Sequence, residues 1–398
     1  MKKLLCILLF SVQYSHAQDW QSLNSGTMNQ LHSVFFKNAD TGFVVGVNGT
    51  LLKTINGGLN WNPQPVPTVS SLYSISFPDR STGYITGDSG IILKTTDGGI
   101  NWIKKYSGFI ADLSSVFFVN ENIGYAVGGA ILKTTDGGIT WTNTPLGNGQ
   151  GPLSVYFTDS LTGYIAGTEW GELSLILKTT NGGITWNTQS VNLSCPLQAV
   201  FFPGKDTGII VGGYYQGCWA ILRTTNGGSN WNIISSGNWG EGYSSVFFTG
   251  INKGFIVGDS GVIKRSSDGG STWQSLYSGT TRRLFSVYFP DSLTGYAVGD
   301  SGTILKTVNG GGVGINDRLN KNKVEIFPNP ATDKITVEVT DATLDGNLTI
   351  VNIEGQQLIT RQITQAKTVI DISNLSGGVY FVRVTNDRAV EVGKIIKN

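Results

Sequence analysis

The 398-residue sequence predicts an all-β protein in two parts, a seven-bladed β-propeller closed by an N-terminal strand and then a small Ig-like β-sandwich. Three observations support this fold class. The turn Thr-Thr-Asp-Gly-Gly-Ile-Thr-Trp (134–141) recurs in six further near copies at intervals of 39 to 45 residues, the length of one four-stranded blade. A copy of one blade's last strand stands near the start of the chain. Beyond residue 310 the repeat stops and short alternating strands of another character begin.

Composition agrees with a turn-rich β protein, because the chain has 54 glycines, only 14% charged residues and little helical periodicity. Its 28 basic side chains oppose 27 acidic ones, so no charge excess suggests binding to nucleic acid or to anionic lipid. His16 and His32 are the only histidines. A histidine-based triad or metal site therefore has little material, and we expect no cofactor, no metal and no catalytic residue.

Residues 1–17 have the pattern of a secretory signal peptide. Lys2-Lys3 precede an apolar run from Leu4 to Phe10, and Ser15-His16-Ala17 forms a small-residue cleavage site. The apolar run is too short to span a bilayer, and no later stretch is long enough. We therefore expect an exported chain without a transmembrane segment.

The residue types of the eight-residue turn follow from the conformation of a tight hairpin turn. Its Asp or Asn accepts backbone N–H groups within a tight hairpin turn, and the two glycines supply positive φ without steric cost. The Trp five residues after the Asp or Asn begins the next strand with a large ring suited to burial between blades. The seven Asp or Asn positions are Asn56, Asp97, Asp136, Asn181, Asn226, Asp268 and Asn309.

Each repeat supplies three strands before this turn. The second strands are Gly-Tyr-Ala-Val-Gly-like (124–128, 295–299) and the third are Ile-Leu-Lys-Thr-like (131–134, 304–307). The first strands are apolar and aromatic in the pattern of buried strands. They are predicted at Leu31–Phe36, Leu72–Phe77, Leu113–Phe118, Leu153–Phe157, Leu197–Phe202, Tyr243–Phe248 and Leu284–Phe289.

The seventh turn is defective, since Gly314 stands where Trp is expected. The mature N-terminus compensates, because Trp20–Gly26 nearly duplicates Trp273–Gly279, the fourth strand of the sixth repeat. An orphan fourth strand thus begins the chain, and a blade without one ends it. We expect residues 20–26 to complete the seventh blade and close the ring, which removes open sheet edges.

These residues carry a resemblance to known repeats. The turn resembles the Asp-box, or bacterial neuraminidase repeat, Ser/Thr-x-Asp-x-Gly-x-x-Trp. Together with the Gly-Tyr/Phe-x-Val-Gly and Leu-Lys-Thr segments, it makes residues 19–310 similar to the seven-bladed propellers of the photosystem II assembly and stability factor family. The resemblance implies the fold of a domain spanning residues 18–310. It does not specify a ligand, because propellers host many unrelated activities.

A Gly/Asn/Lys-rich linker, residues 311–323, precedes the second domain, residues 324–398. Short alternating strands there predict a small β-sandwich. They are expected at Lys334–Val339, Leu348–Ile353, Gln357–Arg361, Thr368–Ile372, Val379–Thr385 and Val390–Ile396.

Residues 324–398 resemble the C-terminal sorting domain of type IX secretion cargo. The segments that carry the resemblance are Val324–Pro330, Ile353–Gln356, Asp371–Leu375, Gly378–Val382 and Lys394–Lys397. The resemblance implies that type IX machinery recognises residues 324–398 and moves the protein through the periplasm and across the outer membrane. The protein is then secreted or held at the outer cell surface, with the domain removed or exchanged for a lipid anchor.

Two enzymatic interpretations compete with a binding function. A sialidase needs an arginine cluster, and the propeller offers only Arg80, Arg223, Arg265, Arg282 and Arg283. A glycosidase needs two carboxylates about 5–10 Å apart. Gly-Asp-Ser-Gly turns could bring them together near the axis, although Asp-Ser-Gly is also an ordinary tight turn. The acids of these turns are Asp88, Asp259 and Asp300. We favour a non-enzymatic binding or structural module, with a secreted glycan-active hydrolase as the alternative.

One face of the propeller is the predicted ligand site. The loop entering strand one and the loop joining strands two and three lie on the same face, because the chain reverses at every strand. On that face blades four and five carry insertions, and the loop entering blade six holds a Trp. Exposed aromatics there suit a glycan or an extracellular protein segment. The candidate residues are Trp170, Tyr214, Tyr215, Trp219, Trp239, Glu169 and Glu172. The interpretation that Trp219 and one Tyr only cover the blade's own core stays open.

The same geometry predicts a disulfide. Cys195 falls in the loop entering blade five, and Cys218 falls in the loop joining its second and third strands. Both loops lie on one face of one blade. We expect the two thiols to be oxidised during export.

Overall fold

The computed structural model describes residues 20–170, 173–214, 217–311, 324–339, 346–352, 355–363, 365, 367–385 and 390–398. The predicted signal peptide and residues 312–323 of the predicted linker lie outside these ranges. The chain divides into two compact units, Met1–Gly312 and Val313–Asn398. Within the described residues, no helix is long and apolar enough to cross a membrane.

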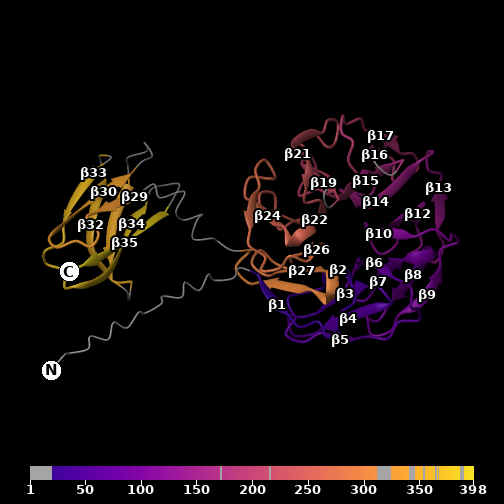
Figure 1. Ribbon diagram of the computed structural model, residues 1–398, viewed down its shortest axis with the longest axis horizontal. Helices are drawn as coiled ribbons and strands as arrows, with labels where there is room; N and C mark the ends of the chain where they lie inside the picture. Colours follow the sequence, from indigo (N-terminus) through magenta and orange to yellow (C-terminus); the bar gives the residue numbers. More distant parts are fainter. Residues whose placement is uncertain are drawn as a thin grey trace, which may run out of the picture. The chain divides into compact units, whose positions relative to one another are not determined.

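The first unit has β-propeller architecture, in which four-stranded antiparallel sheets surround one axis (Figure 1). Seven such sheets lie in its described part. Six follow chain order, beginning with β2 (Leu31–Phe36), β3 (Gly42–Gly46), β4 (Thr50–Thr54) and β5 (Asn62–Pro63). The next five are β6 (Leu72–Ser76), β7 (Gly83–Gly87), β8 (Ile91–Thr95), β9 (Ile103–Tyr106); β10 (Leu113–Phe118), β11 (Gly124–Gly128), β12 (Ile131–Thr134), β13 (Thr142–Thr144); β14 (Gln150–Phe157), β15 (Gly163–Glu169), β16 (Leu173–Thr179), β17 (Asn187–Thr188); β18 (Leu197–Phe201), β19 (Gly208–Gly213), β20 (Gly217–Thr224), β21 (Asn232–Gly240); and β22 (Tyr243–Phe248), β23 (Gly254–Gly258), β24 (Ile263–Ser266), β25 (Gln274–Leu276).

The seventh sheet joins the two ends of the ring. It contains β26 (Leu284–Tyr288), β27 (Gly295–Gly299), β28 (Ile304–Thr307) and, as its fourth strand, β1 (Gln21–Leu23). Strand β1 pairs with β28 in the register Gln21↔Lys306, Ser22↔Leu305 and Leu23↔Ile304. The expected pairing of the N-terminal segment with the last repeat is therefore present.

Trp20 fills the place of the tryptophan that the seventh turn lacks. Its side chain is 0% exposed and meets Phe289 edge to face, with ring centroids 5.9 Å apart. Trp61 meets Phe36 in the first sheet with the same separation of 5.9 Å. Each turn tryptophan thus packs on the aromatic ring at the end of its own sheet's first strand.

The first strands lie innermost. Those of neighbouring sheets contact one another, and Figure 1 places β2, β6, β10, β22 and β26 around the centre with β5, β9, β13 and β17 at the periphery. The second strands are buried, apart from the last two residues of the long β15, because a sheet covers each of their faces. Side chains that line the axis therefore come from the first strands.

Neighbouring sheets are held together by a repeated contact that explains the Leu-Lys-Thr motif. Tyr296 of the seventh sheet stacks on Phe36 of the first, with centroids 3.9 Å apart. Its hydroxyl donates to the Gly57 carbonyl at 2.8 Å, and Lys306 Nζ donates to the same oxygen at 2.6 Å. Each pair therefore fastens its sheet to the eight-residue turn of the next one. The same arrangement recurs with Tyr84 and Lys94 at Gly137, Tyr125 and Lys133 at Gly182, and Tyr164 and Lys178 at Gly227.

The eight-residue turns are closed by local hydrogen bonds. Thr134 Oγ1 donates to Asp136 at 2.8 Å and accepts the N–H of Gly138 at 2.8 Å. Asp136 also accepts the N–H groups of Ile139 and Thr140 at 3.0 and 2.9 Å. Both glycines of each turn have positive φ, 67° and 74° in this one. Turn chemistry thus accounts for the Asp or Asn positions without any ligand.

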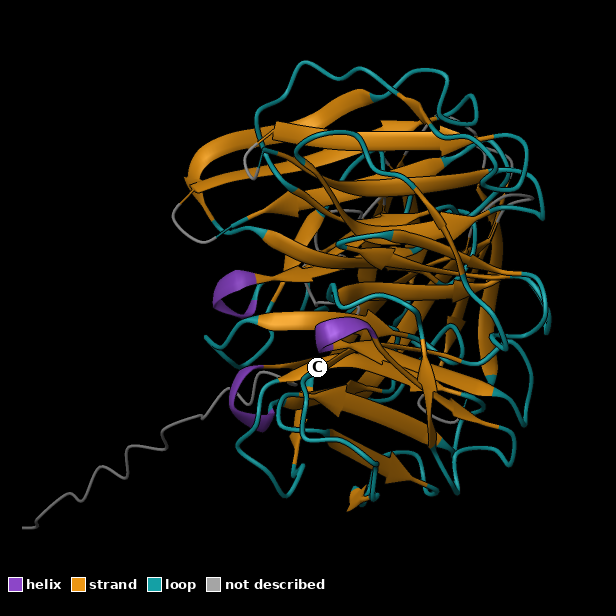
Figure 2. Cartoon of the chain, turned by 90° about the vertical axis from the view of Figure 1, so that its right-hand side faces the viewer, coloured by secondary structure: helices purple, strands orange, loops and turns teal. Residues whose placement is uncertain are grey.

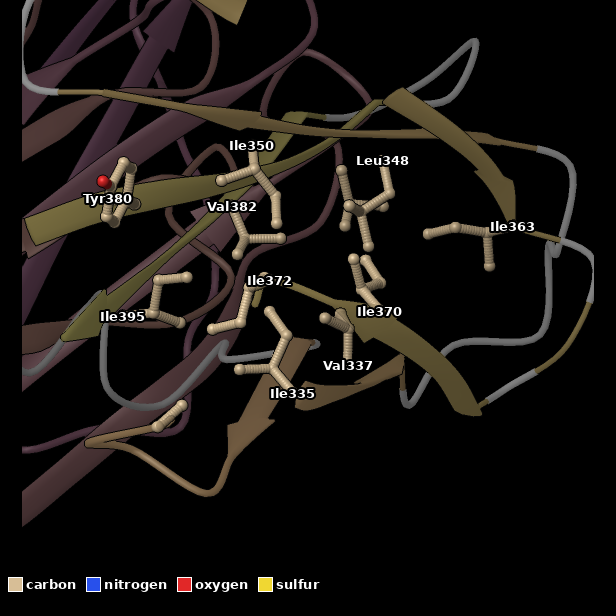
Figure 3. Close-up of a cluster of buried hydrophobic side chains, with 12 residues drawn as sticks. Ile335, Val337, Leu348, Ile350, Ile363, Ile370, Ile372, Tyr380, Val382 and Ile395 are labelled. Atoms are coloured by element: carbon tan, nitrogen blue, oxygen red, sulfur yellow. The ribbon is translucent and has the colours of Figure 1, made fainter. Parts of the chain in front are cut away.

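The second unit has two antiparallel sheets whose apolar side chains meet between them. A three-stranded sheet has the order β29-β30-β33 and a four-stranded sheet the order β32-β31-β34-β35. Figure 3 shows Ile335 and Val337 from the first sheet pointing toward Ile350 and Val382 from the second. Strand β29 was not predicted as a strand. The bounds are β29 (Val324–Phe327), β30 (Lys334–Val339), β31 (Gly346–Val351), β32 (Gln357–Ile363), β33 (Lys367–Asp371), β34 (Gly378–Thr385) and β35 (Val390–Lys397).

Candidate functional site

The turns from second to third strands and the loops entering first strands share one side of the ring, which we call the turn face. Backbone hydrogen bonds join the two kinds of loop, for example Asp88 N–H to Ser71 O at 3.0 Å and Asp259 N–H to Gly242 O at 2.9 Å. Three of the turns are short 3-10 helices, η1 (Asp88–Gly90), η2 (Asp259–Gly261) and η3 (Asp300–Gly302). Figure 2 shows these helices on one side of the sheets.

An aromatic cluster lies at the inner edge of the turn face. A β-bulge interrupts the pairing of each first strand and displaces one residue from the register, which is the second residue in β2, β6 and β26. His32 of β2 consequently lies between Tyr73 of β6 and Phe285 of β26, with ring centroids 5.1 and 5.3 Å away. We call His32, Tyr73, Phe285 and Arg283 the axial arc.

His32 is held as a neutral ring. Burial lowers the pKa of His32, although the Leu72 carbonyl and the carboxylates of Asp88 and Asp300 favour its protonated form. Its Nδ1 lies 3.0 Å from Leu72 O. A carbonyl can only accept, so Nδ1 carries the proton there and Nε2 remains an acceptor for another molecule.

Tyr73 and Asp88 form a second polar element of the cluster. The Tyr73 hydroxyl donates to Asp88, which also accepts the N–H of Ser71 at 2.9 Å. Burial, followed by the bond to Asp88, raises the pKa of Tyr73 to about 12. Partial burial opposes ionisation of Asp88, yet the bonds from Tyr73 and Ser71 lower its pKa overall. Asp88 is therefore an ionised acceptor at neutral pH.

Arg283 supplies the positive charge of the arc. Its Nε lies 3.0 Å from Asp259 Oδ1, and its guanidinium lies over the Phe285 ring at 4.8 Å. Its side chain is 35% exposed, whereas that of Asp259 is 3% exposed. Burial raises the pKa of Asp259 against the opposing effect of Arg283. The guanidinium therefore neutralises a buried acid, donates from Nε and Nη2 to Ser244 Oγ at 3.3 Å, and keeps part of its surface exposed to solvent.

The enzymatic interpretations gain no support from this geometry. The three turn acids have different protein partners: Asp88 binds Tyr73, Asp259 binds Arg283, and Asp300 accepts from Gln30 Nε2 at 2.8 Å. Arg223 donates to Gly269 O at 2.8 Å, in an eight-residue turn away from the turn face. Among the described residues, no group of three or more His, Cys, Asp or Glu side chains could hold a metal ion.

The predicted ligand residues of the fourth and fifth sheets differ in their exposure. Trp170 and Tyr214 lie at hairpin tips and are 66% and 49% exposed. Trp219 is partly buried against Tyr243 of β22 in the sixth sheet, with centroids 6.0 Å apart, so it packs between its own sheet and the next one. Glu169 ends β15 and is partly exposed. Tyr215, Glu172 and the side chain of Trp239 lie outside the described part.

The backbone at Trp239 differs from the prediction. It belongs to strand β21 rather than to a loop, because β21 continues pairing along the long β20 as far as Gly217↔Gly240. The predicted disulfide stabilises this long hairpin. Cys195 and Cys218 are bonded, with Cα atoms 5.7 Å apart, and Ser174 Oγ of the neighbouring sheet donates to Cys195 O at 2.7 Å.

Sequence reasoning did not find the axial arc. His32 was noted only as a leftover histidine, and Arg283 only as one arginine among five. The available signal was positional, because the bulge displaces one residue of each first strand, the second residue in six of the sheets and the fourth in β14. These residues are His32, Tyr73, Ser114, Leu153, Gln198, Ser244 and Phe285.

Comparison with known proteins bears on both units. The family described as photosynthesis system II assembly factor YCF48 matches residues 12–106 and 141–274. The family described as secretion system C-terminal sorting domain matches residues 325–398. No curated protein matches the sequence.

Solved structures resemble the propeller. YCF48 bound to a D1 peptide is 22% identical with a TM-score of 0.61, covering 73% of this chain and 97% of that one. YCF48 from Cyanidioschyzon merolae is 20% identical with a TM-score of 0.58, covering 73% and 98%. The WD40 propeller domain of Doa1 is 11% identical with a TM-score of 0.58, covering 72% and 94%. These likenesses show the fold.

Proposed function

Since the chain belongs to the photosynthesis system II assembly factor YCF48 family and carries a secretion system C-terminal sorting domain, we propose that its propeller is an exported binding module for an extended polypeptide. The sorting domain indicates type IX secretion to the cell surface or the extracellular space, and it implies type IX machinery as a partner. The propeller is then the part of the protein that binds the polypeptide after secretion.

The axial arc is the observation that carries the proposal. His32, Tyr73 and Phe285 present aromatic surface, while His32 Nε2 offers an acceptor and Arg283 a solvent-facing donor. Asp88 adds an ionised acceptor. A site of this kind combines apolar contact with a few fixed polar groups, as ligand sites do. An extended polypeptide suits it because each residue offers an N–H, a carbonyl and a side chain.

The arc is also rigid. Its three aromatic residues lie on three first strands of a closed ring, at bulges that are fixed by strand pairing, and Arg283 directly precedes β26. Preformed sites lose less conformational entropy on binding than mobile loops do. One related structure is described as YCF48 bound to a D1 peptide, which supports a peptide as the class of ligand. No residue role is transferred at this level of identity.

A linear peptide display library, selected on the secreted full-length protein, tests the proposal. Selected peptides should lose about tenfold in affinity, roughly 1.4 kcal/mol, when His32→Ala and Phe285→Ala are combined. The control combines Ile139→Ala and Ile184→Ala, which are exposed residues of two eight-residue turns. Failure to select any peptide, or equal binding by both double variants, would refute the proposal.

A further inference from the structure

Two flat aromatic side chains stand at hairpin tips of neighbouring sheets, apart from the axial arc. In the first sheet the pairing of second and third strands ends at Gly46↔Thr50. In the fourth sheet it continues past Gly167↔Leu175 to Thr168↔Ser174 and Glu169↔Leu173. The tips are therefore extensions of paired strands, which hold side chains more firmly than loops do.

Trp170 forms the first flat surface. The β-carbon position of Gly149 would lie 2.4 Å from Trp170 Cδ2 and 2.6 Å from Cε2. These are the two atoms shared by the indole rings, so the ring system lies across the glycine and only a glycine fits beneath it. One face of the indole is thus covered. The 66% exposure of Trp170 belongs to its remaining surface, which includes the opposite face.

The backbone of Trp170 is strained. Its φ is +53°, a left-handed conformation that is unfavourable for a residue with a Cβ. Its N–H donates to Gly149 O at 2.7 Å, which fixes the conformation. The other non-glycine residues with positive φ are Asn or Ser in turns of the described chain. A large exposed aromatic held in this conformation points to a functional position.

Tyr214 forms the second flat surface, on the fifth sheet. A β-carbon on Gly217 would lie 2.0 to 2.5 Å from three consecutive ring atoms of Tyr214, so this ring also rests on a glycine. Its N–H donates to Cys218 O at 3.1 Å, and Cys218 is bonded to Cys195. The disulfide therefore fixes the tip that presents Tyr214.

The chemistry around both tips excludes several classes of ligand. The sequence has no Lys or Arg between Tyr164 and Leu177, nor between Asp206 and Leu222, so phosphates and acidic polymers lack a counter-charge. The middle strands β15 and β20 pair on both sides, whereas β16 pairs with β17 only at Leu177 and Lys178. A polypeptide competitor therefore belongs in the test of this site.

From these observations we propose that Trp170 and Tyr214 form a binding site for a neutral polysaccharide, with one sugar ring packed on each aromatic face. The C–H groups on one face of a pyranose carry partial positive charge and pack on the negative face of an aromatic ring. Two surfaces on neighbouring sheets require linked sugars rather than a single sugar. Simultaneous contact raises the affinity well above that of either surface alone.

The experiment measures retention of the secreted full-length protein on immobilised cellulose, xylan, chitin and laminarin, with poly-L-proline as a soluble competitor. We expect retention on at least one polysaccharide. Combining Trp170→Ala with Tyr214→Ala should weaken it at least tenfold. The matched control, Tyr106→Ala with Tyr277→Ala, removes aromatics that are 84% and 72% exposed elsewhere and should change retention less than twofold.

Three outcomes would overturn the proposal: no retention on any of the four polysaccharides, equal loss in both double variants, or displacement by poly-L-proline instead of by soluble oligosaccharide. Thermal denaturation of both variants checks that each is folded. The axial variant His32→Ala with Phe285→Ala should retain polysaccharide binding. A failure of this site is therefore distinguishable from a failure of polypeptide binding at the axis.

Discussion

Replacing Trp20 with Ala should destabilise the whole propeller, because this side chain anchors the strand that closes the ring. Trp20 is 0% exposed and packs edge to face on both Phe255 and Phe289, with centroids 6.5 and 5.9 Å away. Truncating a buried Trp to Ala costs about 3–5 kcal/mol. At about 2 °C per kcal/mol, which suits a domain of this size, the midpoint of thermal unfolding should fall by roughly 6–10 °C.

Trp61→Ala provides the matched comparison. Trp61 is also buried and meets Phe36 with the same geometry, but its strand is continuous with its own sheet. Trp20→Ala should lower the midpoint of thermal unfolding at least as much as Trp61→Ala does, because strand β1 has only three paired residues besides Trp20.

Differential scanning calorimetry of the secreted protein measures both midpoints. Size-exclusion chromatography should also show association of Trp20→Ala, since release of β1 exposes the edge of β28. An unchanged midpoint for Trp20→Ala beside a lowered one for Trp61→Ala would refute the closure argument.

Four further predictions follow from single features. Thr86→Val should raise stability by about 1 kcal/mol in urea unfolding, because the buried Thr86 hydroxyl has no hydrogen-bond partner among the described residues; a decrease would contradict this reasoning. Hydrogen bonds from Thr140 lower the pKa of Asp136 to about 2, so its stabilisation is present above the unfolded pKa near 4 and is lost as pH falls toward 2. Asp136→Asn should flatten the acid side of the stability profile, and an unchanged slope would count against it. Replacing Cys195 and Cys218 with Ser should lower stability by about 3 kcal/mol, and thiol titration of the unfolded, unreduced exported protein, from which the predicted signal peptide with Cys6 has been removed, should find no free thiol. Truncation after Lys323 should leave a folded propeller in the periplasm, as measured by immunoblotting of cell fractions. Normal appearance of the truncated protein outside the cell would contradict a sorting role.

Local chemistry made most of the fold predictable. Each eight-residue turn specifies its own conformation through one Asp or Asn and two glycines, so its period reveals the sheets. The match between Trp20–Gly26 and Trp273–Gly279 revealed the closing strand for the same reason. Strand β29 escaped prediction because Val324–Phe327 is short and precedes two prolines, which obscure a strand pattern.

The axial arc escaped prediction because it is a product of symmetry rather than of a motif. His32, Tyr73 and Phe285 lie in different repeats, and each is an ordinary residue of a buried strand when read alone. Only the bulge, repeated around the ring, brings them together. The role of Lys306 was hidden similarly, since its partner Gly57 lies in another sheet.

The closing strand also sets a minimum time between the synthesis of β1 and closure of the ring. Ser22 of β1 pairs with Leu305 of β28, so about 280 further residues must be synthesised before the partner strand of β1 exists. At 5–20 residues per second, that delay is about 15–60 s. An incomplete chain cannot form the seventh sheet, and its exposed strand edge marks it as unfinished. Closure of the ring therefore requires a chain that extends at least to the end of β28 (Ile304–Thr307).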